Sequence, residues 1–189
     1  MANLHLEVKH AVNALKAGNI ILFPTDTYWS LGCDSGNKDA LDKLYKLKQS
    51  NSERNITCLV ADDRMLNRYV NEIPAAAQSI IDVVDTPTTI IYDAPKTIAS
   101  NLISKNNTIA IRIPDDEFCY QLSRRFNGAI ATSIAHIDGE TIPKSFKEIV
   151  PAILKGVDYV VNLQKEKICT TSAAIIQITN SNVVKVLRK

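Results

Sequence analysis

Hydrophobic residues recur at helical spacing at the start of the chain and then give way to a short continuous hydrophobic run. The helical period is carried by Leu4, Val8, Ala11, Val12 and Leu15, and Gly18 supplies a stop. Residues 20–23 form a buried-strand pattern that ends at Pro24. The pattern therefore predicts a helix, a strand and then an abrupt loop.

The alternation of helical and extended patterns continues along most of the chain. Helices are predicted at 39–47, 63–70, 74–84, 115–126 and 144–154, and strands at 56–61, 88–92, 108–113, 129–132 and 157–163. The last two strands, 173–178 and 183–187, are joined by a polar turn and predict an antiparallel hairpin. This order predicts an α/β fold with a mixed sheet, whose ligand site lies where strands end in the loops 24–32, 46–54 and 132–139.

Composition limits the kind of protein. The chain has 189 residues, 46% of them hydrophobic, so we expect one domain over 1–189 with no additional C-terminal domain. Because 22 basic and 20 acidic residues leave a net charge of +2, any basic surface must be local. No segment has the roughly 18 apolar residues of a membrane span, and the four cysteines form no C-x-x-C pair. A cytoplasmic protein with free thiols and no membrane association is expected.

Phosphate binding, if present, must depend on side chains. Only six glycines occur, and they assemble neither of the glycine-rich phosphate-binding patterns. The turn 24–27 carries Thr25, Asp26 and Thr27 directly after a buried strand, where hydroxyl and carboxylate groups could grip a small polar ligand. A turn that satisfies only its own backbone would contain the same residues.

Cationic side chains stand near two predicted loops. Lys48 ends a predicted helix in a stretch that also contains Arg54, although a solvated helix face would explain both. Arg112 shares one strand face with Ala110, opposite the isoleucines, which fits either a lined concave surface or an exposed edge strand. Thr132 and Ser133 end the next strand with hydroxyls suited to phosphate oxygens or a cation, or to capping.

Four segments together resemble the YrdC-like family of threonylcarbamoyl-AMP synthases. The segments are 24–32 (PTDTYWSLG), 46–49 (KLKQ), 110–114 (AIRIP) and 131–133 (ATS), in matching order and spacing. The resemblance implies a single-domain twisted mixed sheet with flanking helices and a concave basic cleft. It also implies a nucleotidyltransferase that makes threonylcarbamoyl-AMP and pyrophosphate from L-threonine, bicarbonate and ATP. That product is used to modify an adenosine beside the tRNA anticodon.

The resemblance also implies roles for individual residues. Lys48 and Arg112 would be catalytic, and Thr25, Thr27 and Thr132 would bind substrate. The nucleotide would be held by Lys48, Arg54, Arg112, Ser133 and Ser172. Mg²⁺ would accompany ATP without metal ligands from the protein, and tRNA, double-stranded RNA or tRNA-modification proteins are the implied macromolecular partners.

The chain departs from the family pattern at positions that bear on phosphate binding. Ser50 stands where the family has an arginine, and Ala135 where it has an asparagine. Each loss would cost about 2 to 4 kcal/mol of transition-state stabilisation. Arg54 and Ser172 are the candidate replacements. The alternative function is therefore a catalytically weakened relative that binds nucleotide or RNA without efficient turnover.

Overall fold

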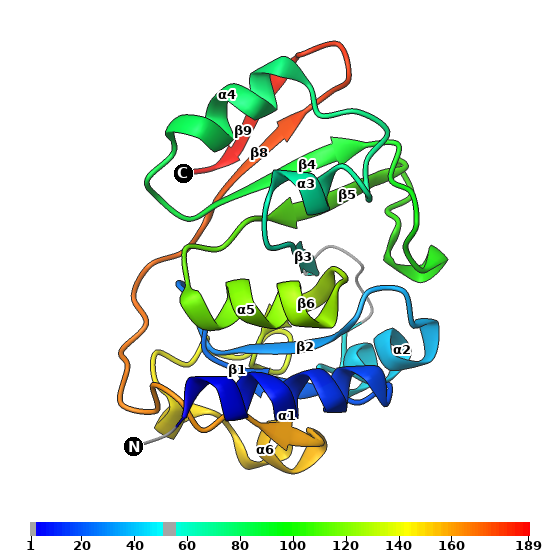
Figure 1. Cartoon of the computed structure of the whole chain (residues 1–189). Coiled ribbons are helices and arrows are strands. Elements are labelled where there is room, and N and C mark those ends of the chain that lie inside the picture. The colour runs from blue at the N-terminus through cyan, green and yellow to red at the C-terminus, as the bar shows by residue number, and fades with distance from the viewer. Residues whose placement is uncertain (1–2, 51–55) are drawn as a thin grey trace.

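Helices and strands alternate along the part of the chain that the structure, a computed structural model, describes: residues 3–50 and 56–189 (Figure 1). The α-helices are α1 (Leu4–Lys16), α2 (Lys38–Leu47), α3 (Asp63–Leu66), α4 (Ala75–Val83), α5 (Glu117–Phe126) and α6 (Pro151–Gly156). Two short 3₁₀ helices are η2 (Ser100–Leu102) and η3 (Phe146–Glu148). The strands are β1 (Ile21–Phe23), β2 (Ser30–Asp34), β3 (Thr57–Leu59), β4 (Thr88–Asp93), β5 (Thr108–Arg112), β6 (Ile130–Ile134), β7 (Tyr159–Val160), β8 (Ala174–Ile178) and β9 (Val184–Arg188).

The described strands form a single mixed sheet in the order β7-β1-β2-β6-β3-β5-β4-β8-β9. The pairs β1/β7, β3/β5 and β4/β8 are parallel, and the remaining neighbours are antiparallel. The predicted α/β fold, its mixed sheet and the final antiparallel hairpin are thus confirmed. The sheet also places β6, β3 and β5 side by side, so that residues distant in sequence meet near the strand ends.

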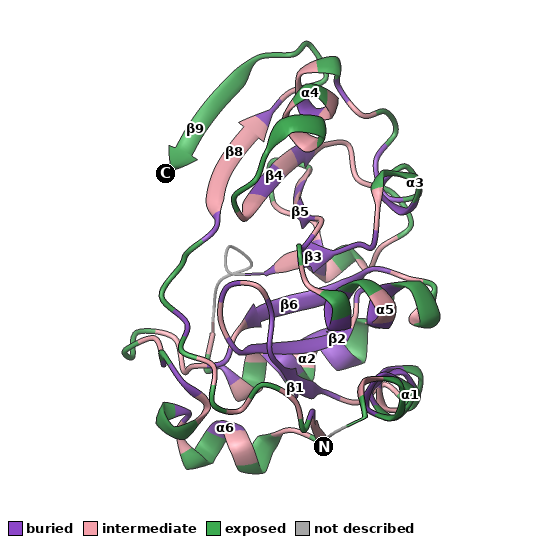
Figure 2. Cartoon of the chain, turned by 60° about the vertical axis from the view of Figure 1, so that its left-hand side comes forward, coloured by how far each residue is buried: buried purple, intermediate pink, exposed green. Residues whose placement is uncertain are grey.

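Helices cover the sheet and bury its central strands, which Figure 2 shows in purple. The helices α1 and α5 pack against β1 through a cluster that includes Val8, Phe23, Phe118 and Leu122. A second, larger cluster joins α2, α3, α4 and α6 to the sheet. Burying each large aliphatic side chain contributes about 1.5 to 3 kcal/mol, so both layers hold the central strands in a fixed arrangement.

Several predicted boundaries were wrong. The loop predicted at 24–32 contains the start of β2, which is buried along almost its whole length and therefore shows no alternating pattern to recognise. Gly32 is required there, since a Cβ would lie 2.6 Å from Phe23 Cε1. The helix predicted at 144–154 divides into η3 and α6, because Pro151 lacks an N–H and starts a helix instead of continuing one.

The ends of α5 and the state of the four cysteines follow from the residue types at those positions. The Asp116 carboxylate accepts the Cys119 N–H at 2.9 Å and so caps α5. Asn127 ends α5 in the left-handed conformation. Cys33, Cys58, Cys119 and Cys169 are all free and buried. Within the described residues, no helix is long and apolar enough to cross a membrane.

Candidate functional site

A cavity of about 260 Å³, here called the Arg112 cavity, lies where β2, β3, β5 and β6 face the final hairpin. Its lining comes from widely separated segments of the chain and includes six threonines and serines besides Tyr28, Ser172 and two arginines. The lining residues are Thr27, Tyr28, Ser30, Thr57, Thr89, Arg112, Thr132, Ser133, Ile134, His136, Ile142, Ser172, Ala173, Ile175 and Arg188. Several candidates from the sequence therefore meet at one place.

The threonine turn after β1 is held by its own hydrogen bonds. Thr25 is fully buried, and its hydroxyl oxygen accepts the Thr27 N–H at 3.1 Å and lies 2.8 Å from the Tyr28 carbonyl. The two threonine hydroxyls are 3.0 Å apart. Thr27 lines the Arg112 cavity, whereas Thr25 does not. Thr25 thus fixes the turn that presents Thr27.

Arg112 lies at the end of β5 and is held from one side by the same turn. Its guanidinium donates to the Asp26 carboxylate, and Nη2 donates to the Thr27 hydroxyl at 3.4 Å. Both partners of the ion pair are nearly buried, with 6% and 8% of their side chains exposed. A buried and paired arginine keeps a fixed orientation, so Arg112 presents an oriented group of donors to the cavity.

The hydroxyls at the end of β6 also reach the cavity. Thr132 Oγ1 donates to the Thr57 carbonyl at 2.8 Å, so this side chain joins β6 to β3. Ser133 lines the same cavity, and both side chains are almost fully buried. Ser133 can therefore offer its hydroxyl to a bound group, while Thr132 mainly fixes the strand ends.

Lys48 lies behind the cavity and is absent from its described lining. The side chain is fully buried, and Nζ donates to the carbonyls of Ile134 and His136 at 2.9 and 2.8 Å. Nζ also lies 3.1 Å from Asp138 Oδ1. Burial lowers the pKa of Lys48, whereas the hydrogen bond and charge of Asp138 act in the opposite direction. In this structure Lys48 fixes the segment after β6.

His136 reaches the Arg112 cavity from that segment, a position to which the sequence analysis gave no role. Its Nδ1 lies 3.3 Å from the Ile134 carbonyl oxygen. Burial and the nearby Lys48 ammonium lower the pKa of His136, while the Ile134 carbonyl, Asp138 and Glu140 oppose that change. A neutral imidazole is therefore favoured at this wall near neutral pH.

The final hairpin supplies the opposite wall. Ser172 is exposed, and its hydroxyl lies 3.3 Å from the Tyr28 hydroxyl. Arg188 of β9 donates from Nε and Nη2 to the Ala173 carbonyl at 3.0 and 2.7 Å. Sequence reasoning missed Arg188 because the predicted strand ended at Leu187. Its pairing with Ile175 follows an irregularity in the register of the hairpin, so no pattern in the sequence indicated its place.

Neither Ser50 nor Ala135 lines the Arg112 cavity. Ala135 is fully buried, and its N–H donates to the Trp29 carbonyl at 2.9 Å. The Ser50 N–H donates to the Tyr45 carbonyl at 3.0 Å at the end of α2. Arg54, the candidate replacement for the missing arginine, lies outside the described residues.

The donor set of the Arg112 cavity does not suit a metal ion held by the protein. Its described lining contains no carboxylate, and no group of three or more potential metal-binding side chains occurs in residues 3–50 and 56–189. Mg²⁺ prefers carboxylate and phosphate oxygens. Any Mg²⁺ would therefore have to enter with an anionic substrate.

The model of the Sua5/YciO/YrdC family, described as "telomere recombination", matches residues 13–189. The chain thus belongs to this family. Curated relatives named threonylcarbamoyl-AMP synthase include one from Photobacterium profundum, 28% identical over 159 residues that cover 79% of this chain and 86% of the relative. Another, from Idiomarina loihiensis, is 29% identical over 155 residues that cover 80% and 83%.

Solved structures show the same fold. Escherichia coli YciO superposes with a TM-score of 0.84 at 22% identity and covers 99% of this chain and 90% of its own. The Pyrococcus abyssi Sua5 structure described as complexed with L-threonine superposes with a TM-score of 0.80 at 19% identity over 90% of this chain. That alignment covers 50% of Sua5, so this chain spans about half of its length. The YrdC-like fold implied by the resemblance is confirmed.

Proposed function

We propose that the protein is a threonylcarbamoyl-AMP synthase that uses L-threonine, bicarbonate and ATP in tRNA modification. The observation that carries the proposal is the gathering of Thr27, Arg112, Ser133, Ser172 and Arg188 around one cavity. The names of the curated relatives support the same activity and support an enzyme in general. Transfer of an adenylyl group, which would make it a nucleotidyltransferase, belongs to this proposal.

The chemistry needs fixed donors more than acid and base catalysis. A carbamate oxygen of N-carboxylated threonine attacks the α-phosphorus, the bond from that phosphorus to the bridging oxygen breaks, and pyrophosphate leaves with its electron pair. Negative charge grows on the phosphate oxygens during this step. Arg112 and Arg188 would bind these oxygens, because guanidinium groups match phosphate geometry and stay charged.

The remaining residues would bind and orient the substrates. Thr27, supported by Thr25, would contact threonine, and Ser133 would donate to a phosphate oxygen. Mg²⁺ would arrive with ATP and neutralise part of its charge, since the described cavity lining provides no carboxylate. The basic character of the cleft, the role of Thr132 and the role of Ser172 remain predictions of this proposal.

Pyrophosphate release tests the proposal directly. Purified protein is incubated with ATP, Mg²⁺, bicarbonate and L-threonine, and release should require all four. Ser133→Ala should lower kcat by roughly tenfold or more, since it removes a hydroxyl from the phosphate site. Lys185→Ala, on β9 and outside the cavity lining, is the control and should retain full activity. Release that does not depend on threonine would refute the proposal.

A second candidate function has its own supporting observation. Lys48 is bound to two carbonyls and the Asp138 carboxylate rather than to the cavity, and Ser50 replaces an arginine of the family pattern. A protein with these features would bind nucleotide, tRNA or double-stranded RNA and turn over slowly. ATP binding without threonine-dependent pyrophosphate release, together with salt-sensitive RNA binding, would favour this function. The cytoplasm is the compartment that suits either function and the free thiols.

A further inference from the structure

A second cavity, here called the Tyr92 cavity, lies on the opposite face of β4 and β5 and has a volume of about 490 Å³. Thr88, Ile90 and Tyr92 of β4 line it, whereas Thr89 lines the Arg112 cavity. The same alternation places Ile111 on one side and Arg112 on the other. The two cavities are therefore separate spaces, and the proposed synthase activity leaves the larger one without a role.

The wall formed by α4 is apolar and incompletely packed. Ile80, Ile81 and Val84 line the cavity beneath this helix. Ala77 is the only buried residue in α4. A helix whose apolar residues face an open space gains from a ligand that fills it, because apolar burial contributes about 25 cal/mol per Å². The body of a suitable ligand is therefore apolar.

Tyr92 provides a polar group inside this apolar space. The side chain is 98% buried, being 2% exposed, and lines the cavity. Its hydroxyl makes no hydrogen bond with a described residue, and the oxygen is not one of the fully enclosed unpartnered polar atoms, so it is accessible from the cavity that Tyr92 lines. Burial raises the pKa of Tyr92 above its ordinary value, so the hydroxyl keeps its proton. A buried phenol normally finds a partner, and one on a ligand would satisfy it.

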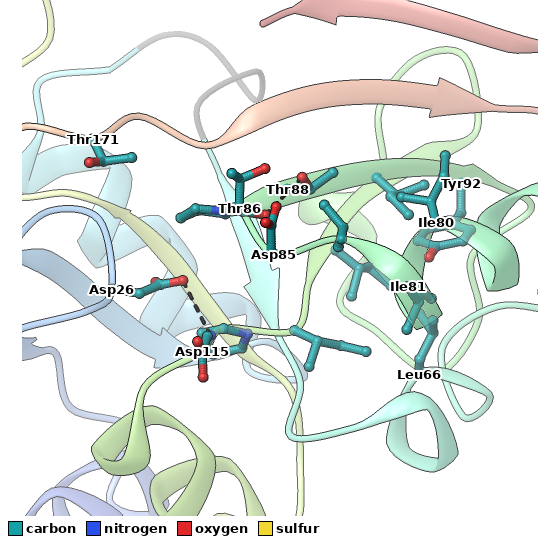
Figure 3. A pocket seen from close by; sticks show the side chains of 16 residues that line it. Asp26, Leu66, Ile80, Ile81, Asp85, Thr86, Thr88, Tyr92, Asp115 and Thr171 are labelled. Carbon is teal, nitrogen blue, oxygen red and sulfur yellow. Dashed lines mark hydrogen bonds between the residues drawn. The ribbon is translucent and has the colours of Figure 1, made fainter.

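The other end of the cavity is acidic. Figure 3 shows Asp26 and Asp115 at the end away from Tyr92, with Asp85 between them and the α4 isoleucines. Asp26 is already paired with Arg112, whereas no ion pair of Asp85 or Asp115 with a described residue occurs. No lysine or arginine lines this cavity within the described residues. A cation is therefore favoured at this end.

We propose that the Tyr92 cavity binds a small amphipathic amine, with an ammonium group beside Asp85 and Asp115, an aromatic or branched aliphatic body under α4, and a hydroxyl-type group that hydrogen-bonds Tyr92. Charge excludes carboxylate and phosphate ligands, and the apolar walls exclude fully polar amines. The proposal is independent of the synthase activity, because none of its residues is assigned to ATP or threonine.

Tyramine is a suitable probe, since it combines an ammonium, an aromatic ring and a phenol. Amide chemical shifts of the full chain, followed by NMR during titration, should change in a saturable manner in α4 and β4 and leave Ser133 and Arg188 unaffected. Hydroxyphenylpropionate, which carries a carboxylate in place of the ammonium, should not bind. Absence of saturable changes with tyramine, equal binding of the anion, or changes confined to the Arg112 cavity would overturn the proposal.

Two conservative variants test the polar ends separately. Tyr92→Phe should weaken tyramine binding by roughly threefold to tenfold and leave phenethylamine, which has no phenol hydroxyl, unchanged. The double variant Asp85→Asn and Asp115→Asn should weaken both amines by roughly threefold or more. Asp82→Asn, on α4 but outside the cavity lining, is the matched control. Equal weakening by the control, or equal loss of both amines in Tyr92→Phe, would contradict the assigned contacts.

Discussion

Lys48 and Asp138 contact each other twice, through the backbone and through their charges. The Asp138 N–H donates to the Lys48 carbonyl at 2.9 Å, and Lys48 Nζ lies 3.1 Å from Asp138 Oδ1. Nζ also donates to the carbonyls of Ile134 and His136. One buried side chain thus fixes the segment that carries Ser133 and His136 to the Arg112 cavity.

Asp138→Ala should strongly destabilise the protein, because it leaves the Lys48 ammonium buried without its counterion. We expect the free energy of unfolding to fall by about 3 kcal/mol or more, measured by urea denaturation. Glu166→Ala, which breaks the exposed Lys147–Glu166 pair, is the control and should cost less than about 1 kcal/mol. Equal effects of the two substitutions would mean that the buried pair is not a structural element.

Stability should decrease as the pH falls below the ordinary pKa of histidine. The pKa of His136 is lowered in the folded protein, so the unfolded state binds the proton first and is favoured by acid. The contribution of His136 to the free energy of unfolding is fully present above the pKa that this histidine has in the unfolded chain. It is lost as the pH falls toward the lower pKa that His136 has in the folded protein. Urea denaturation of the wild type and of His136→Gln from about pH 7.5 to about pH 5.5 measures this difference. The same slope in both proteins would contradict the assignment.

Arg188→Ala should weaken ATP binding by roughly tenfold or more, because a charged hydrogen bond contributes about 1.5 to 3 kcal/mol. Isothermal titration calorimetry measures the change. Lys185→Ala removes a positive charge from the same exposed strand without removing a cavity-lining group, and it should alter Kd by less than about twofold. Similar losses in both variants would assign the effect to net charge rather than to the position of Arg188.

The four cysteines should resist thiol reagents in the native protein. Burial raises the pKa of Cys58 to about 12 and also raises the pKa values of Cys33, Cys119 and Cys169. The reactive thiolate is therefore scarce at mildly alkaline pH. A chromogenic thiol reagent should report four reactive groups in concentrated guanidinium chloride and almost none in buffer. Rapid reaction of the native protein would show that a buried cysteine becomes accessible.

The fold could be predicted largely because its elements obey local periods. The alternation along β5 correctly separated Ile109 and Ile111, which join the larger hydrophobic cluster, from Arg112, which lines a cavity. The strand β2 was missed because it is buried almost throughout and shows no alternation. The alternation of hydrophobic and polar residues therefore failed to predict a strand that is covered on both faces.

The site was predicted less completely than the fold. Thr27, Arg112, Ser133 and Ser172 do line one cavity, as their common assignment to a site required. The position of Lys48 could not be predicted, because it depends on carbonyl groups and a carboxylate far along the chain. Arg188 was missed since an irregular register in the final hairpin decides which of its residues faces Ile175. These features depend on tertiary contacts that leave no local pattern.

The walls of the Arg112 cavity have a consequence for how the protein acquires its site. Its lining extends from Thr27 to Arg188, so no short continuous fragment contains it. Pairing β4 with β8 closes the long stretch of chain between these two strands. The conformational entropy of that stretch is lost before the contacts between the strands can compensate for it. Ligand binding should therefore be among the last properties to appear during refolding, after helices and local hydrophobic clusters have formed.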